Sequence, residues 1–285
     1  MKRFEYYEPR SVGEATTLLS TLVGDVAVLA GGTDLLNQMK REELSPNSLI
    51  NLKSITGLSY IHLDGSRSVR IGALTRIADL ATNEPLRCAF PAIVDAARSL
   101  GLPSVRNRAT IGGNLCHASP AADMAPALIA YGAEVKVVGP QGHRRLPVES
   151  FFVGPGRNAL GKGEILTEIA VDTPDLSGRS VYFKHSIRKA NDTAIVGVAA
   201  YAAIDPRSGC VAAIGLGLGA VSPTPVRARL AEAAIRGKKA DTPLINEAAN
   251  IASGECQPIG DIRGSAAYRT EMVRVFARRA LEAVL

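Results

Sequence analysis

Two pairs of adjacent glycines, Gly31-Gly32 and Gly112-Gly113, are the residues whose type and spacing point most directly to chemistry. Each pair is flanked by threonine and by a strand-like apolar run. The first pair follows small apolar residues at 26–30 and precedes a predicted helix that begins at Asp34. Glycine lets a ligand approach the main chain, and unpartnered amides at the start of a helix attract anions. One such loop fits a phosphate and two opposed loops fit a dinucleotide, although a glycine pair is also a common tight connection.

Backbone amides are the expected phosphate ligands at the first pair, because its loop contains no Lys or Arg. The sequence has no G-x-G-x-x-G after the first strand, which argues against a Rossmann site. It has no G-K-[ST], which argues against a Walker A loop. It has no G-x-S-x-G, which argues against the nucleophile elbow of a hydrolase. Glu164 and Glu168 share one face of a predicted strand, where a solvated rim is the simpler explanation. Cys116 and His117 are sequence neighbours, which rarely face each other. A dinucleotide cradle without an acid–base pair suggests that a cofactor carries the chemistry.

Bulk properties favour a globular protein of two or three packed units. The chain has 285 residues, of which 46% are hydrophobic and 21% are charged. No apolar run is long enough to span a membrane, and residues 1–7 lack the apolar segment of a secretory signal, so we expect a cytoplasmic location. The net charge is +6, but the basic residues are scattered and Trp is absent, so we expect an acidic ligand or partner rather than nucleic acid. The four cysteines and four histidines lack metal-ligand spacing, and we expect no metal in this chain.

The elements that must position the glycine pairs can be predicted from periodicity and turn residues. Residues 4–52 predict a β-α-β-α-β unit whose first helix opens with a capping box at Ser11 and Glu14. A hairpin with its turn at Asp64-Gly65 follows, and Thr75 is expected to cap the next helix. Residues 104–123 are predicted to be irregular, because they combine Gly, Asn, Ser and Pro.

The C-terminal part of the chain is predicted to form an antiparallel sheet followed by helices. Residues 172–178 are dense in turn formers and indicate a boundary. Strand-like runs at 180–185, 194–204 and 210–220 are joined by short loops, which favours antiparallel pairing. A final helix is predicted over 265–284 from apolar residues at helical spacing.

Three motifs of this sequence resemble the FAD-binding medium subunit of the xanthine dehydrogenase/carbon monoxide dehydrogenase family of molybdenum hydroxylases. The motifs are Ala30-Gly31-Gly32-Thr33-Asp34-Leu35-Leu36, Thr110-Ile111-Gly112-Gly113-Asn114-Leu115 and Ser119-Pro120-Ala121-Ala122-Asp123. The resemblance covers nearly the whole chain. It continues through Ile71–Thr75, Gly163–Leu166, Lys184 with Arg188, Gly219–Ala228 and the tail from Tyr268 to Leu281.

The resemblance implies an α+β fold in three parts. Residues 1–55 and 56–176 would form two α/β FAD-binding subdomains of the vanillyl-alcohol-oxidase (PCMH) type. Residues 177–285 would form a C-terminal domain of the carbon monoxide dehydrogenase flavoprotein type, with an antiparallel sheet and helices.

The resemblance also implies which residues bind FAD. Amides of the first motif would hold the pyrophosphate, and the second motif would clasp the cofactor near the flavin. Asp123 matches a position that hydrogen-bonds the cofactor, Leu166 and Lys184 match positions that touch the isoalloxazine region, and Leu100 falls at a further contact position. The implied set is Val28, Leu29, Ala30, Gly31, Gly32, Thr33, Asp34, Leu35, Leu100, Thr110, Ile111, Gly112, Gly113, Asn114, Asp123, Leu166 and Lys184.

Several of these roles have a simpler alternative. Asp123 could cap the helix at 122–130, Lys184 could be a solvated strand residue and Leu166 could belong to the core. Asp34 places an anion where the pyrophosphate would lie. It is tolerable if its carboxylate caps the amides of its own helix and points away from the phosphates.

In this family the flavin subunit receives electrons from [2Fe-2S] clusters on a small subunit, which take them from a molybdopterin cofactor on a large subunit. The resemblance therefore implies that this chain binds FAD without a covalent link and passes electrons to NAD, a quinone or another acceptor. The implied assembly is a heterotrimer or a dimer of heterotrimers, with substrate oxidation and its catalytic residues on the large partner. One alternative is a structural or assembly subunit whose FAD does not turn over. A self-contained FAD oxidase is disfavoured, because no catalytic base is apparent.

Overall fold

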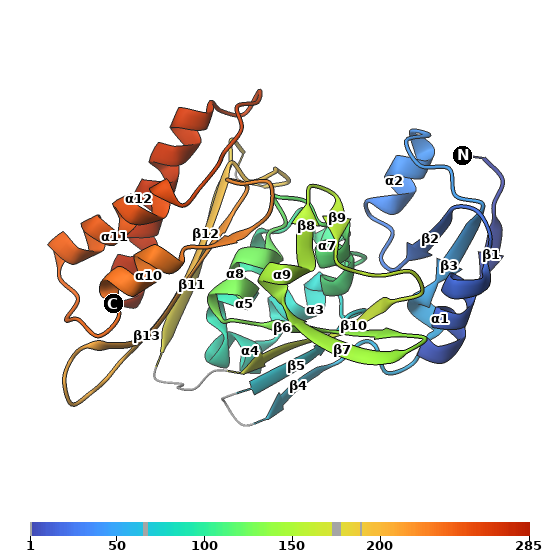
Figure 1. The fold of residues 1–285 in the computed structure, drawn as a ribbon, viewed down its shortest axis with the longest axis horizontal. Coiled ribbons are helices and arrows are strands. Elements are labelled where there is room, and N and C mark those ends of the chain that lie inside the picture. The colour runs from blue at the N-terminus through green and yellow to red at the C-terminus, as the bar shows by residue number, and fades with distance from the viewer. Residues whose placement is uncertain (1, 65–67, 173–177, 189) are drawn as a thin grey trace.

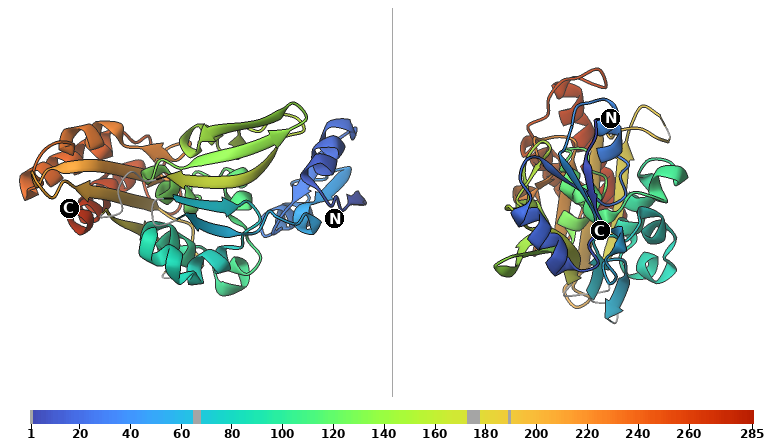
Figure 2. Two further views of the ribbon diagram at one scale, coloured as in Figure 1. Left: turned by 90° about the horizontal axis from the view of Figure 1, so that it is seen from below. Right: turned by 90° about the vertical axis from the view of Figure 1, so that its right-hand side faces the viewer.

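The computed structural model describes residues 2–64, 68–172, 178–188 and 190–285, and these residues form three units in a row (Figure 1). The N-terminal unit, in blue, lies at one end of the long axis, and the helices of the C-terminal unit, in orange and red, lie at the other. Figure 2 shows the same order in two further views, with the middle unit between the other two. Each unit has a sheet of its own.

The N-terminal unit is the predicted β-α-β-α-β arrangement. Its elements are β1 (Glu5–Tyr7), α1 (Val12–Thr21), β2 (Val26–Leu29), α2 (Leu35–Lys40), β3 (Ser48–Asn51) and the 3-10 helix η1 (Leu52–Ser54). The strands are parallel in the order β1-β3-β2, and every residue of the central strand β3 is buried. Ser11 caps α1 as expected, by accepting from the Glu14 amide at 3.1 Å. The Glu14 carboxylate accepts from the Arg10 amide at 2.8 Å, one residue before the cap.

The middle unit is built on an antiparallel five-stranded sheet in the order β4-β5-β10-β6-β7. Its strands are β4 (Ile61–Asp64), β5 (Ser68–Gly72), β6 (Glu134–Gly139), β7 (Gly142–Pro147) and β10 (Ile165–Asp172), with a small pair β8 (Phe152–Gly154) and β9 (Arg157–Asn158). Its helices are α3 (Ile77–Thr82), α4 (Glu84–Ala89), α5 (Pro91–Ser99), α6 (Pro103–Arg106), α7 (Ile111–His117), α8 (Met124–Ala130) and α9 (Val148–Phe151). The strands of the predicted hairpin pair as expected, while the turn from Gly65 onward lies outside the described residues.

Two local predictions for the middle unit are wrong. The stretch 104–123, predicted to be irregular, contains most of α6 and all of α7. Its glycines serve close packing within or beside a helix, since a Cβ on Gly112 would lie 2.6 Å from the Ala73 carbonyl oxygen. Thr75 does not cap α3, because its hydroxyl is already bound to the backbone of Tyr60, donating to the carbonyl at 2.9 Å and accepting from the amide at 3.0 Å.

The C-terminal unit is an antiparallel sheet covered by helices on both faces, as Figure 1 shows for its outer face. Its elements are β11 (Arg179–His185), β12 (Val196–Ile204), β13 (Val211–Gly219), β14 (Val226–Arg227), α10 (Arg229–Ile235), α11 (Thr242–Gly254) and α12 (Ala266–Val284). In β12, Ala199, Tyr201 and Ala203 pack toward the middle unit, whereas Val198 and Ala200 pack toward α11 and α12. The predicted final helix is confirmed, with Ser265 as its cap. Most of the predicted boundary at 172–178, residues 173–177, lies outside the described residues.

The close contact between β13 and α8 predicts a large effect of a single methyl group. A Cβ on Gly215 would lie 1.8 Å from the carbonyl oxygen of Ala130, at the end of α8. Because a backbone atom cannot move aside as a side chain can, we expect Gly215→Ala to lower the free energy of unfolding by about 1–3 kcal/mol or more. Urea unfolding followed by circular dichroism measures this.

Gly254→Ala is the matched control, because no described residue beyond its own helix and its chain neighbours comes within 4 Å of a Cβ at this last residue of α11. We expect it to be neutral or to stabilise by up to about 1 kcal/mol. Equal stability of Gly215→Ala and wild type would show that the units do not pack as closely as described.

None of the helices in the described part of the chain is both long and apolar enough to cross a membrane.

Candidate cofactor-binding site

The two glycine motifs, which come from different units, lie against each other. A Cβ on Gly31 would lie 2.1 Å from the carbonyl oxygen of Arg108 and 2.9 Å from the Ala109 Cα. A Cβ on Gly113 would lie 3.9 Å from the Ala30 Cβ. Glycine at position 31 is therefore required by the close approach of two backbones. The structure thus brings residues 28–35 and 110–114 together at the boundary between the N-terminal and middle units.

The first motif presents a row of unused backbone donors. Within the residues that the structure describes, the amides of residues 31–35 donate no hydrogen bond. Gly32 has φ +78°, a conformation that glycine adopts readily, and its carbonyl accepts from the Leu36 amide at 3.1 Å. Since α2 has only six residues, its dipole adds little, and attraction of an anion to this loop would come from the row of amides.

The expectation that Asp34 caps α2 is wrong. Asp34 occupies the cap position, but its backbone is helical (φ −101°, ψ −51°) and its side chain makes no capping hydrogen bond. A capping side chain needs an extended backbone to reach the amides of the first turn. The Asp34 side chain is exposed instead, so the helix amides are left to other acceptors.

The second motif differs from the first, because its amides are already bonded. Ile111 donates to the Thr75 carbonyl at 3.0 Å, and Gly112 donates to the Ala73 carbonyl at 2.9 Å. Thr110 caps α7, accepting from Gly113 through its hydroxyl at 3.1 Å and from Asn114 through its carbonyl at 3.0 Å. The paired motifs suggest two equivalent loops of free amides. The structure shows that the two loops are not equivalent, because the amides of the second motif are already hydrogen-bonded within the protein.

In the second motif, the side chain of Asn114 has an unused hydrogen-bond acceptor. Its Oδ1 atom is buried and has no hydrogen-bond partner among the described residues. An unpartnered buried acceptor costs free energy, so such an atom points to a ligand that would satisfy it.

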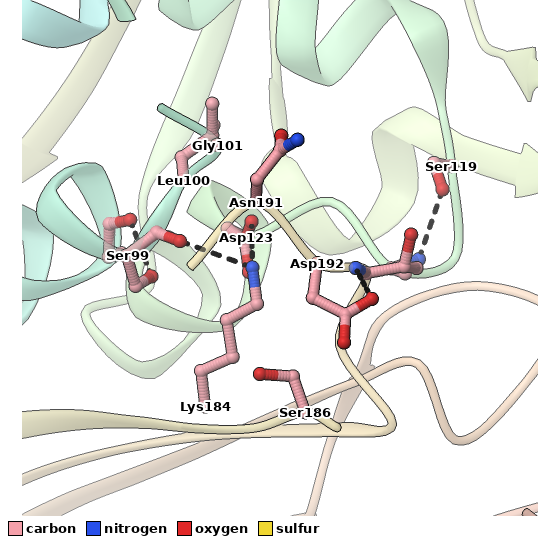
Figure 3. A network of polar contacts seen from close by, with 12 residues as sticks. Ser99, Leu100, Gly101, Ser119, Asp123, Lys184, Ser186, Asn191 and Asp192 are labelled. Carbon is pink, nitrogen blue, oxygen red and sulfur yellow. Dashed lines mark hydrogen bonds and ion pairs between the residues drawn. The ribbon is translucent and has the colours of Figure 1, made fainter. Parts of the chain in front are cut away.

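A second polar cluster surrounds Asp123 and Lys184 (Figure 3). The Lys184 Nζ donates to Asp123 Oδ2 at 2.9 Å and to the Ser99 carbonyl at 3.2 Å, and the Tyr182 hydroxyl donates to Asp123 Oδ1 at 3.0 Å. Asp123 does not cap α8, and the Lys184 side chain is only 9% exposed, so neither simpler alternative holds. Burial raises the pKa of Asp123, while the Lys184 ammonium acts in the opposite direction.

A cavity of about 380 Å³ opens beside this cluster. It is lined by Ser99, by the end of β11 and by residues after that strand, including Ser186, Asn191 and Asp192. Figure 3 shows Asn191 and Asp192 on the loop that faces Lys184. Tyr182 and the loop residues are absent from the predicted set. Tyr182 could have been found, because it lies two residues before Lys184 and so shares its face of β11, whereas the loop carries no such signal.

Two predicted contact residues lie near the site in different ways. Leu100 directly follows Ser99, the last residue of α5, and is 8% exposed. Its carbonyl accepts a hydrogen bond from Arg106 Nη1 at 3.0 Å. Leu166 lies in β10 opposite Val137, is 3% exposed and packs in the core of the middle unit. Core packing thus accounts for Leu166, and its contact with a cofactor stays a prediction.

The residues present fit an FAD molecule. The unused amides at 31–35 fit a pyrophosphate, the Asn114 Oδ1 lacks a donor, and Gly31 keeps the two motifs close enough to act together. Among the described residues no group of three or more His, Cys, Asp or Glu side chains could hold a metal ion.

Comparison with known proteins agrees with this geometry. Residues 2–174 match the family "FAD binding domain in molybdopterin dehydrogenase", and residues 181–284 match the "CO dehydrogenase flavoprotein C-terminal domain". The chain is 36% identical over 282 residues to the carbon monoxide dehydrogenase medium chain of Hydrogenophaga pseudoflava, covering 99% of this chain and 96% of that protein. It is 34% identical over 281 residues to the glyceraldehyde dehydrogenase medium chain of Sulfolobus acidocaldarius, covering 99% and 98%.

A solved structure shows the same fold. A chain of the carbon monoxide dehydrogenase of Hydrogenophaga pseudoflava superposes with a TM-score of 0.94 at 37% identity, covering 99% of this chain and 97% of that one. The predicted α+β fold, with an FAD-binding part and a C-terminal antiparallel sheet with helices, is thereby confirmed. This chain belongs to the FAD-binding medium subunits of the xanthine dehydrogenase/carbon monoxide dehydrogenase family of molybdenum hydroxylases, and it is an oxidoreductase subunit.

Proposed function

We propose that this chain binds FAD without a covalent link and carries electrons from [2Fe-2S] clusters on a partner subunit to an acceptor such as NAD or a quinone. The observation that supports it best is the contact between the two glycine motifs, one with five amides and the other with the buried Asn114 Oδ1 that have no hydrogen-bond partner among the described residues. FAD would supply a redox centre that accepts electrons from a one-electron donor and passes them on in pairs.

The proposed contacts follow the positions of the residues in the structure. Amides within Val28–Leu35 bind the pyrophosphate, and Thr110–Asn114 fixes the cofactor from the middle unit. Asp123 and Lys184, with Leu100 beside Ser99, form the polar end of the site near the cavity. Leu166 is proposed at the isoalloxazine region on the resemblance alone.

The proposed assembly has a small [2Fe-2S] subunit and a large molybdopterin subunit, as a heterotrimer or a dimer of heterotrimers in the cytoplasm. The relatives named above are medium chains, a designation that belongs to multi-subunit enzymes. Substrate oxidation is assigned to the large partner.

The experiment that tests the function is stopped-flow reduction of the co-expressed complex with the substrate of its large subunit. Electron transfer through this chain predicts that flavin absorbance is bleached at a rate no slower than turnover. A flavin that stays oxidised while the complex turns over would contradict electron transfer. That result would instead favour the alternative, a structural or assembly subunit whose FAD does not turn over.

Asn114 offers a variant that separates cofactor binding from folding. Its Oδ1 has no partner among the described residues, so removing it deletes an unsatisfied acceptor. We expect Asn114→Ala to leave the stability of the FAD-free chain unchanged or slightly higher. Losing one hydrogen bond to the cofactor should weaken FAD binding by about three- to tenfold. Thermal unfolding with and without FAD measures both effects, and a loss of stability without FAD would contradict the assignment.

A further inference from the structure

Two basic residues that belong to neither glycine motif lie against the loop that carries the unused amides, Lys53 through its side chain and Arg108 through its backbone. Lys53, in η1, donates from Nζ to the carbonyl oxygen of Ala30 at 3.3 Å. Arg108 belongs to the middle unit, and its carbonyl is the atom that a Cβ on Gly31 would meet at 2.1 Å. The loop that starts at Ala30 therefore contacts the side chain of a lysine from its own unit and the backbone of an arginine from the next.

The two cations are close enough to repel each other. Partial burial of the ammonium group, on a side chain that is otherwise exposed, and the nearby Arg108 charge lower the pKa of Lys53, and Glu8 opposes them with a smaller effect. The Glu8 carboxylate is already bound, since it accepts from the Tyr6 hydroxyl at 2.8 Å and from Asn51 Nδ2 at 2.9 Å.

Within the part of the chain that the structure describes, neither Lys53 nor Arg108 forms an ion pair within 4 Å of a carboxylate, and Glu8 acts on Lys53 from a greater distance. Without its cofactor the chain thus holds two like charges beside five unused amides.

We propose that Lys53 and Arg108 bind the pyrophosphate of FAD together with the amides of residues 31–35. This inference rests on the proposed function and adds the charged partners of the anion to it. Amides can fix the position of an anion, while the cations neutralise its charge and are themselves relieved of their mutual repulsion. Hydrogen bonds between ionised partners are about twice as strong as neutral ones. Because both side chains are exposed, salt should screen their contribution.

The test is a fluorescence titration of the full-length, FAD-free chain with FAD at low and high ionic strength. We expect Lys53→Gln and Arg108→Gln each to weaken FAD binding by about three- to tenfold at low salt, and the difference from wild type to shrink at high salt. Lys40→Gln is the matched control, because Lys40 is an exposed lysine in the last turn of α2. It removes the same charge from the same unit and should leave the affinity unchanged.

Two further readouts distinguish charge binding from a structural role. Lys53→Gln should leave the urea midpoint of the FAD-free chain close to that of wild type, because losing the exposed hydrogen bond to the Ala30 carbonyl is offset by removing the like-charge contact with Arg108. Inorganic pyrophosphate should compete with FAD in the wild type and compete less well in Lys53→Gln. A variant that loses stability and affinity together, with no dependence on salt, would overturn the inference.

The inference and the proposed function fail in different ways. If wild type binds FAD and the Gln variants bind it equally well at low salt, the inference alone is overturned. If wild type binds no FAD but binds pyrophosphate in a way that depends on Lys53, the FAD function fails and the anion site stands.

Discussion

Gly31→Ala is expected to weaken FAD binding at least about tenfold while the chain still folds. The added Cβ would lie 2.1 Å from the Arg108 carbonyl oxygen, a backbone atom, so the loop at 30–34 would have to move away from the middle unit. Overpacking of this kind costs about 1–3 kcal/mol, and moving the loop separates its amides from the second motif. We expect the dissociation constant for FAD to rise at least about tenfold, which corresponds to about 1.4 kcal/mol.

The control for this variant is Gly13→Ala in α1, in the same unit. Among the described residues outside the backbone of α1 and the chain neighbours, a Cβ there would meet only the Ser11 Oγ, at 4.0 Å, so we expect unchanged FAD binding and equal or slightly higher stability. Circular dichroism should show a folded chain for both variants. FAD affinity of Gly31→Ala within twofold of wild type would show that the contact between the motifs does not shape the site.

Lys184→Met is expected to have the largest effect on stability among the variants of the site. It leaves the Asp123 carboxylate, whose side chain is 10% exposed, with the Tyr182 hydroxyl as its remaining partner. Removing one partner of a buried ion pair typically costs about 3–5 kcal/mol, because the other charge is left uncompensated. Chemical denaturation at neutral pH measures this loss.

The stability lost in Lys184→Met should become smaller as the pH falls. Burial already raises the pKa of Asp123 above its ordinary value of 3.8, and the variant lacks the ammonium that opposes this rise. A carboxyl whose pKa is raised by folding favours the folded state when protonated, so its contribution is lost as pH rises through the folded pKa. The deficit of Lys184→Met should therefore be full at neutral pH and smaller as pH falls toward 4.

The double variant Asp123→Asn/Lys184→Met checks the cause of this effect. It removes both charges, so it should be more stable than Lys184→Met at neutral pH and should lose the pH dependence. A Lys184→Met protein as stable as wild type at all pH values would mean that the pair is not buried in solution.

Elements with a clear local signal could be predicted from the sequence. The cap at Ser11, the parallel N-terminal unit and the long helix α12 follow from side-chain chemistry that acts within a few residues. The segment 104–123 could not be predicted in this way, since Gly112 is fixed by the backbone at Ala73, far away in the sequence. Helix propensity disfavours glycine, and tertiary packing overrides it here.

In the site, too, some features could be predicted from local sequence and others depend on the folded structure. The glycine pairs identify the two motifs, but sequence alone does not show that the amides of the first are unused and those of the second are bonded. Asp34 was a reasonable capping residue by type, and only its helical backbone excludes that role. Lys53 and Arg108 lie outside both motif cores and become relevant because folding places them against one loop.

The most direct test of the central claim, that this chain is an FAD-binding subunit, is equilibrium titration of the purified, FAD-free chain with FAD. We expect saturable binding of one FAD per chain, with quenching or enhancement of flavin fluorescence and a rise in the unfolding temperature as FAD is added. A folded chain that shows no saturable FAD binding and no change in unfolding temperature would contradict it.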